Sequence, residues 1–167
     1  MTFTAPVLSY SLLSPMLFLL AGALIGVLVE AFVSKAARPA VQLTVTLGAL
    51  LLALMQLWQI RGEQSLTAAM GSVVFDGPAA LLQASILIIA MISVFLIADG
   101  EHFAALPAAL PGSEEERQAI QSGNQITEVY PLTLFAVAGM LLFPVANDLI
   151  TLFVALEMLS LPLYLMA

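Results

Sequence analysis

Five apolar stretches, each about as long as a lipid bilayer is thick, constrain this chain more than any other feature. They cover residues 12–33, 41–60, 79–98, 130–146 and 148–167. A helix needs about 20 mostly apolar residues to cross the hydrocarbon layer, and a helix satisfies its own backbone polar groups there. The sequence therefore predicts an all-α, polytopic bundle of about five transmembrane helices embedded in a lipid bilayer.

Charged residues are too scarce for a water-soluble surface. They make up 9% of the 167 residues, whereas a soluble domain carries about 25%. The chain has no cysteine and a single histidine, His102, so we expect no disulfide and no metal site built from thiolates or several imidazoles. Its four Lys and Arg residues are too few for nucleic-acid binding, which depends on many basic contacts with phosphate. No ligand pattern for a flavin, iron–sulfur cluster or NADH occurs, so we predict no cofactor in this chain.

The basic residues predict how the spans are oriented. Lys35 and Arg38 lie between the first two stretches, Arg61 follows the second, and Arg117 lies between the third and fourth. With the N-terminus outside, three of these four residues face the cytoplasm, as the positive-inside rule favours. No Lys or Arg precedes the first stretch, which is also too long for a signal-peptide core, so we expect it to remain as a true span.

One polar loop divides the chain. Residues 99–128 hold six of the eleven acidic residues together with prolines and glycines, a composition typical of a solvated loop. A contact surface for a soluble partner is the alternative. We therefore separate residues 1–128, with three spans and this loop, from residues 129–167, with the last two spans. Residues 61–78 form a shorter expected loop with turn chemistry near its end.

Several polar residues fit structural roles at helix ends. Asn147 and Asp148 join the last two stretches so closely that these helices must be antiparallel neighbours. Asp148 and Asp76 each precede a span and suit an N-cap, whose side chain accepts free backbone N–H groups. Glu30, near Lys35 at the cytoplasmic end of the first span, can extend to the interface. Further polar side chains suit bonds between helices or contact with headgroups, namely Gln42, Gln56 and Gln83.

Glu157 is the ionisable residue that the apolar pattern does not explain. It lies eight residues after Leu149, which is about 12 Å into the helix and close to the bilayer midplane. A charged side chain there costs about 2.5–3.5 kcal/mol, and the apolar residues around it return roughly 3–6 kcal/mol, so the helix can still insert. Such an acid indicates a proton carrier or an ion-pair partner. A protonated glutamate that hydrogen-bonds a neighbouring helix is the alternative.

We expect three residues that follow Glu157 in the same helix to support it, namely Ser160, Pro162 and Tyr164. Ser160 and Tyr164 share its helix face and can hydrogen-bond a carboxyl group or an ordered water. Pro162 has no N–H, so the carbonyl of Met158 loses its helical partner. That frees an acceptor one residue from Glu157; a kink without chemistry is the alternative for Pro162.

The end of the chain resembles a known family. The segment ANDLITLFVALEMLSLPLY, residues 146–164, is similar to subunit N of proton-translocating NADH-quinone oxidoreductase, respiratory complex I. The segments SPMLFLLAGALIGVLVEAF and VVFDGPAALLQ agree with it more loosely. The resemblance implies that this chain is the N-terminal part of a larger antiporter-like membrane-arm subunit, with residues 129–167 as the start of its proton-translocation module. The chain also stops inside its last apolar stretch, so we expect it to be incomplete.

The resemblance also implies a mechanism and a setting. In the family the glutamate matching Glu157 pairs with a lysine on a later helix, and their changing interaction helps to move a proton. NADH, FMN, iron–sulfur clusters and quinone are held by other subunits, and the partners are antiporter-like and small hydrophobic membrane-arm subunits. The setting is the bacterial inner membrane, and the enzyme is a translocase to which this chain contributes no redox site.

Some features depart from the family pattern and keep other functions open. No lysine occurs in any predicted span, so the partner of Glu157 must lie elsewhere. Pro78 and Gln83 stand where the family has an aromatic and often a basic residue. The alternatives are a subunit of a cation/proton antiporter or a membrane-bound hydrogenase, and a structural membrane subunit without a proton relay.

Overall fold

The computed structural model describes residues 9–60, 66–99, 113–114 and 126–166. Its helices follow the apolar stretches closely, because each stretch is bounded by polar or turn-forming residues. They are α1 (Tyr10–Phe32), α2 (Arg38–Ile60), α3 (Gly77–Ala98), α5 (Val129–Leu142) and α6 (Leu149–Met166). A single 3₁₀ turn, η2 (Phe143–Val145), extends α5. The all-α class predicted from the sequence is confirmed.

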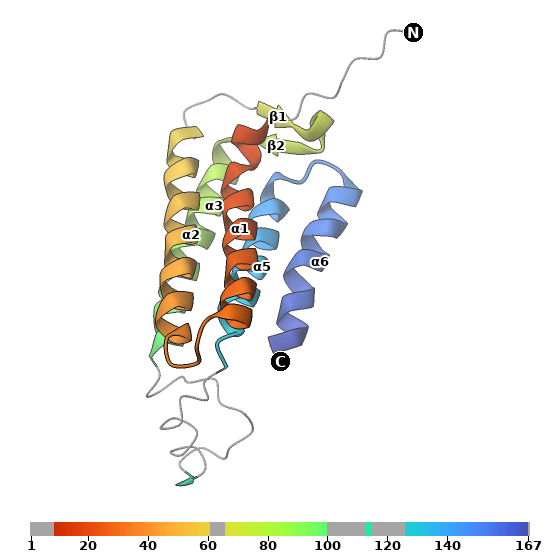
Figure 1. Ribbon diagram of the computed structural model, residues 1–167. Coiled ribbons are helices and arrows are strands. Elements are labelled where there is room, and N and C mark those ends of the chain that lie inside the picture. The colour runs from red at the N-terminus through yellow and green to blue at the C-terminus, as the bar shows by residue number, and fades with distance from the viewer. Residues whose placement is uncertain (1–8, 61–65, 100–112, 115–125, 167) are drawn as a thin grey trace.

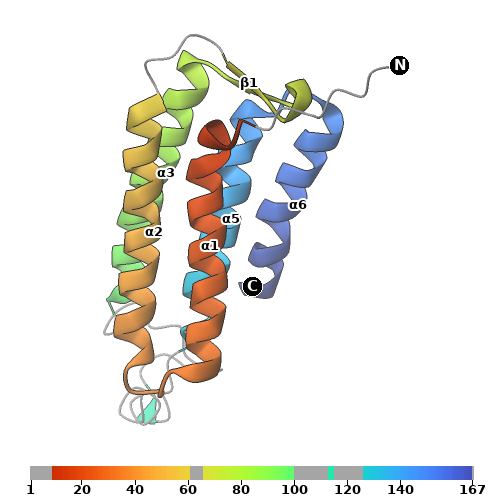
Figure 2. The same ribbon diagram turned by 45° about the horizontal axis from the view of Figure 1, so that its top comes forward.

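The helices pack as a bundle with one member at its edge. Figures 1 and 2 show α1 beside α2 and α5, with α3 behind α2 and α6 on the far side of α5. Within the described ranges, α1, α2, α3 and α6 are long and apolar enough to cross a membrane, whereas the helical segment Val129–Val145 is shorter. The predicted fourth span is therefore an apolar helix below the length of the others. Together these helices make a multi-pass membrane protein.

Leucines and small residues fill the space between the helices. Leu19, Leu50, Leu87 and Leu134 are completely buried where α1, α2, α3 and α5 meet. A Cβ atom added to Gly22 of α1 would lie 2.5 Å from the Cβ of Ala49 on α2. Small residues at such positions let helix backbones approach closely, which membrane helices need because lipid gives them little hydrophobic drive to associate.

Two buried glutamines connect helices through hydrogen bonds. Gln83 of α3 donates to the carbonyl of Leu141 at the end of α5, at 2.7 Å. Gln42 of α2 donates to the carbonyl of Gly26 on α1, at 2.8 Å. Both side chains are almost fully buried. We expected them either to bond between helices or to contact headgroups, and in the structure they bond between helices.

A short β-hairpin replaces part of the loop expected between the second and third spans. Strands β1 (Leu66–Ala68) and β2 (Val73–Phe75) pair antiparallel around the turn η1 (Ala69–Gly71). The turn places Ala69 and Met70 at φ values of 49° and 60°, a region that such residues rarely adopt. Strands of three residues with an atypical turn give no periodic signal, so sequence patterns do not predict this hairpin.

Candidate functional site

Glu157 lies in the middle of α6, which among the described elements mainly contacts α5. Ala155 and Pro162 are the buried residues of α6, and they face α5, the helix that α6 mainly contacts. Glu157 itself is exposed in the described structure. Glu157 lies eight residues after Leu149, where the helix begins, as counted from the sequence.

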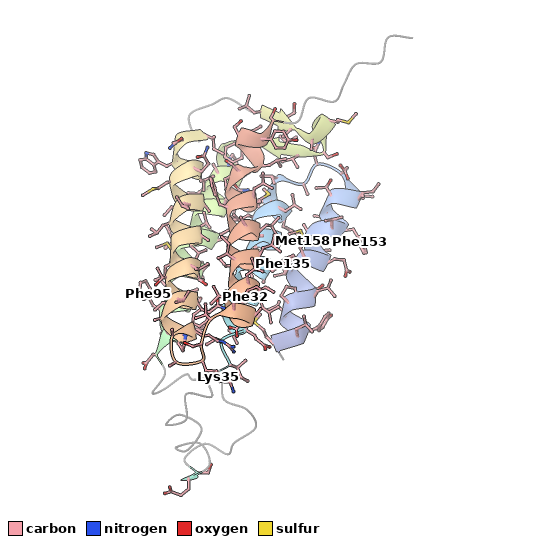
Figure 3. The ribbon with its side chains drawn as sticks, in the orientation of Figure 1. Phe32, Lys35, Phe95, Phe135, Phe153 and Met158 are labelled. Carbon is pink, nitrogen blue, oxygen red and sulfur yellow. The ribbon has the colours of Figure 1, made fainter. Side chains whose placement is uncertain are left out.

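Glu157 contributes to the wall of an apolar cavity between α1, α5 and α6. The cavity has a volume of about 450 Å³ and is lined by Val27 of α1, Leu132 and Phe135 of α5, and Glu157 with its helical neighbours. Figure 3 labels three of the lining residues, Phe135, Phe153 and Met158. Glu157 is the one ionisable residue among those that line it. The other lining residues are therefore all apolar.

A glycine sets the distance between α5 and α6 beside Glu157. A Cβ atom added to Gly139 would lie 2.7 Å from the backbone N of Leu159 and 2.9 Å from the backbone C of Met158. The two backbones are therefore in direct contact at the turn that carries Glu157. Sequence reasoning did not single out Gly139, although glycine among apolar helix residues is the usual signal for such a contact.

The three expected supporting residues have different environments. Pro162 is buried and lines the same cavity as Glu157, and it leaves the Met158 carbonyl without its helical donor. The Ser160 hydroxyl donates to the backbone carbonyl of Glu157 at 3.5 Å, which is a weak bond at that length. The Tyr164 ring is 77% exposed. Pro162 is therefore the one of the three that shares the cavity.

The turn before α6 is attached to the β-hairpin. The backbone N–H of Asn147 donates to the carbonyl of Ser72 at 2.9 Å, and its side-chain amide donates to the carbonyl of Gly71 at 2.8 Å. Val73 also forms an isolated β-bridge with Ala146. The hairpin thus fixes where α6 begins. Asn147 has the structural role expected at the start of α6, but the sequence did not indicate that its partners are Ser72 and Gly71.

Asp148 caps the first turn of α6. Its carboxylate accepts the backbone N–H of Thr151 at 2.7 Å and the Thr151 hydroxyl at 3.0 Å. The Thr151 backbone N–H, together with the Ser72 hydroxyl, holds the pKa of Asp148 below its usual range. Asp76 acts in the same way at α3, where it accepts the backbone N–H of Ala79 at 2.8 Å.

The cap at Asp148 predicts a pH-dependent start of α6. Because the folded pKa is lowered, the carboxylate stabilises the fold above its unfolded pKa of about 3.9, and this contribution is lost as pH falls through the folded pKa. We expect the Thr151 amide to exchange hydrogen faster in Asp148→Ala than in wild type at neutral pH, with the difference vanishing in acid. Asp148→Asn keeps a cap oxygen without the charge, so the protection of the Thr151 amide against exchange should not change with pH in this variant. Equal exchange of the Thr151 amide in wild type and Asp148→Ala at neutral pH would contradict the prediction.

Glu30 forms a polar cluster at the opposite end of the bundle. Its carboxylate accepts the side-chain amide of Gln42 at 2.8 Å and lies 3.4 Å from the guanidinium of Arg38. Lys35 is the basic residue nearest to Glu30 in the sequence, and the structure pairs Glu30 with Arg38 and Gln42 of α2. The cluster therefore joins α1 to α2, consistent with the structural role expected of Glu30.

Removing the amide of Gln42 should weaken this junction. Gln42→Met keeps the side-chain size but leaves the Glu30 carboxylate and the Gly26 carbonyl without their donor, which costs about 1–3 kcal/mol. We expect a lower thermal unfolding temperature of the detergent-solubilised protein. Adding Glu30→Met should cost less than the two single losses together, because the double variant no longer leaves a Glu30 carboxylate without its Gln42 donor. Fully additive losses would show that the bond between Glu30 and Gln42 is not important.

No grouping of three or more His, Cys, Asp or Glu side chains suitable for a metal ion occurs among the described residues. The described helices, with one acid in the middle of a span, define a multi-pass membrane protein with a candidate intramembrane proton or ion site.

Comparison with curated proteins finds relatives that are similar to nearly the whole of this chain. It is 48% identical to NADH-quinone oxidoreductase subunit N of Acidothermus cellulolyticus, over 98% of this chain and 32% of that relative. The subunit N of Thermobifida fusca is 47% identical over 99% of this chain, which corresponds to 32% of that relative. Subunit N 3 of Streptomyces griseus is 42% identical over 99% of this chain, which corresponds to 33% of that relative. No family model matches the chain.

The chain is therefore homologous to part of NADH-quinone oxidoreductase subunit N, and it spans about a third of the length of these relatives. The resemblance noted from residues 146–164 is confirmed, and it extends over nearly the whole chain.

Proposed function

We propose that this chain is part of the membrane-arm subunit N of a proton-pumping NADH-quinone oxidoreductase in a bacterial inner membrane. The observation that carries the proposal is the 48% identity to a subunit N over 98% of the chain. The relatives described above all bear the subunit N name, which favours this function over the antiporter and hydrogenase alternatives. In this setting other subunits hold NADH, FMN, iron–sulfur clusters and quinone, and the neighbours are other membrane-arm subunits, both antiporter-like and small hydrophobic.

Within that subunit, residues 129–167 begin the proton-translocation module and Glu157 carries a proton. Its place in the middle of α6 and on an apolar cavity supports this role. A cation brought near such a carboxylate favours its charged form, and withdrawal of the cation favours protonation. No lysine or arginine is among the described residues that line this cavity, and in this proposal a residue outside that set supplies the cation. Pro162 and Ser160 support the local helix geometry.

The proposal is tested by Glu157→Gln in the assembled complex. Glutamine keeps the shape of the side chain and its hydrogen bonds but cannot carry a proton. A several-fold loss of proton translocation per NADH oxidised, in a complex that still assembles, supports the relay. Unchanged translocation overturns it and leaves Glu157 as a packing residue.

A further inference from the structure

The connector between α5 and α6, residues 146–148, is bonded to the turn of the β-hairpin. The backbone N–H of Asn147 donates to the carbonyl of Ser72, and its side-chain amide donates to the carbonyl of Gly71 at 2.8 Å. The residue before Asn147 adds an isolated β-bridge to Val73. Figure 2 shows the hairpin lying across the end of the bundle and reaching the start of α6. The start of α6 is therefore tied to a segment far from it in the chain.

The hairpin itself is firmly held. Ala68 of β1 and Phe75 of β2 are buried in the core of the bundle. Between the strands, Ala69, Met70 and Gly71 have consecutive φ values of 49°, 60° and 92°. Left-handed backbone is unfavourable for Ala69 and Met70, and it persists only where the surrounding structure holds it, often at functional sites. This strained turn presents the Gly71 carbonyl to the connector.

The rest of α6 has little to fix its rotation and depth. Among its described residues Ala155 and Pro162 are the buried ones, and α5 is the helix that it mainly contacts. Apolar packing between two membrane helices gives little drive to hold one register. A slip of one residue would turn α6 by about 100° and move it by about 1.5 Å. The attachment at Asn147 therefore decides where Glu157, ten residues later, is placed.

We propose that Asn147 is a positioning residue for Glu157. Its side-chain bond to the Gly71 carbonyl ties α6 to the anchored hairpin, and this sets the rotation and depth at which the Glu157 carboxylate meets the cation of the proposed relay. The inference rests on that proposed relay role. Asn147 neither gains nor loses a proton, so it acts only through the place it gives to α6.

Two substitutions of Asn147 test the side-chain bond in the assembled complex. Asn147→Asp keeps the shape of the side chain but has no N–H to donate, and Asn147→Ala removes the side chain altogether. Both keep the backbone N–H that bonds Ser72. Met70→Ala is the matched control, because Met70 lies in the same turn and its side chain is 80% exposed. The measurements are protons translocated per NADH oxidised in vesicles, and the amount of subunit in the intact complex.

Both Asn147 variants should lower the number of protons translocated per NADH oxidised several-fold in complexes that still oxidise NADH, whereas Met70→Ala should match wild type. A misplacement of about 1 Å in a reacting group can lower a rate by up to about a hundredfold. A merely structural bond would instead reduce the amount of assembled complex and leave the proton ratio of each remaining complex unchanged. That outcome, or loss of assembly in both variants, overturns the proposal.

Combining Asn147→Ala with Glu157→Gln separates this proposal from the relay. If Asn147 acts through Glu157, the double variant should retain the same residual translocation as Glu157→Gln alone. A further loss in the double variant shows that Asn147 acts elsewhere and overturns the positioning role. If Glu157→Gln loses translocation while both Asn147 variants keep the wild-type ratio, the relay stands and the positioning role is wrong. Normal translocation in Glu157→Gln overturns both.

Discussion

Replacing Gly139 with alanine, and still more with leucine, is expected to force α5 and α6 apart and to reduce the amount of assembled protein. The added Cβ atom would lie 2.7 Å from the backbone N of Leu159 and 3.0 Å from the carbonyl oxygen of Ala155. These are backbone atoms, which cannot rotate away as a side chain can, so the helix itself must shift. Overpacking of this kind costs about 1–3 kcal/mol, and more where the obstacle is rigid.

Gly48 provides the matched control for this prediction. It also lies within a helix, α2, but a Cβ atom there would have no neighbour within 4 Å. Gly48→Ala should therefore be neutral or slightly stabilising, since alanine is the better helix former by about 1 kcal/mol. The measurement is the yield and thermal stability of the complex in detergent. If Gly139→Ala assembles as well as Gly48→Ala, the close contact between α5 and α6 is not important for the fold.

Glu157→Gln is expected to lower proton translocation several-fold without loss of assembly. The side chain is exposed on α6 in the described structure and faces an apolar cavity, so glutamine fits the same space with similar hydrogen bonds. What glutamine lacks is an ionisable proton. Translocation is measured as vesicle acidification per NADH oxidised, and assembly is measured as the amount of subunit in the intact complex.

Glu157→Asp distinguishes a relay from a packing role. Aspartate keeps the ionisable group but shortens the side chain by one methylene, so a relay predicts more translocation in Glu157→Asp than in Glu157→Gln. A packing role predicts the reverse, because glutamine preserves the length and the hydrogen-bonding capacity of the original side chain. Equal and undiminished translocation in both variants would remove Glu157 from the mechanism.

Features set by neighbours in the chain were predictable from the sequence. The bounds of α1, α2, α3 and α6 agree with the predicted spans to within a few residues. The caps at Asp76 and Asp148 were also predictable, because each carboxylate accepts an N–H only three residues further along. The antiparallel pairing of α5 and α6 follows from the short connection between them.

Features that depend on residues distant in the chain were not predictable in the same way. Lys35 is the basic residue closest to Glu30 in the sequence, whereas packing of α1 against α2 brings Arg38 and Gln42 to Glu30. The contact at Gly139 depends on the residue of α6 that faces it, which periodicity alone does not give.

The sequence by itself determined that this chain crosses a membrane several times and carries an acid in the middle of one span. The number of consecutive apolar residues and the spacing along a helix are local quantities, so composition and order settle them. Only the tertiary structure decided that the hairpin fixes the start of α6, through Asn147 and Gly71, which are 76 residues apart. It alone also brought Glu157 to a cavity shared with Val27 of α1 and Leu132 of α5, because that arrangement depends on how three helices pack and not on any one of them.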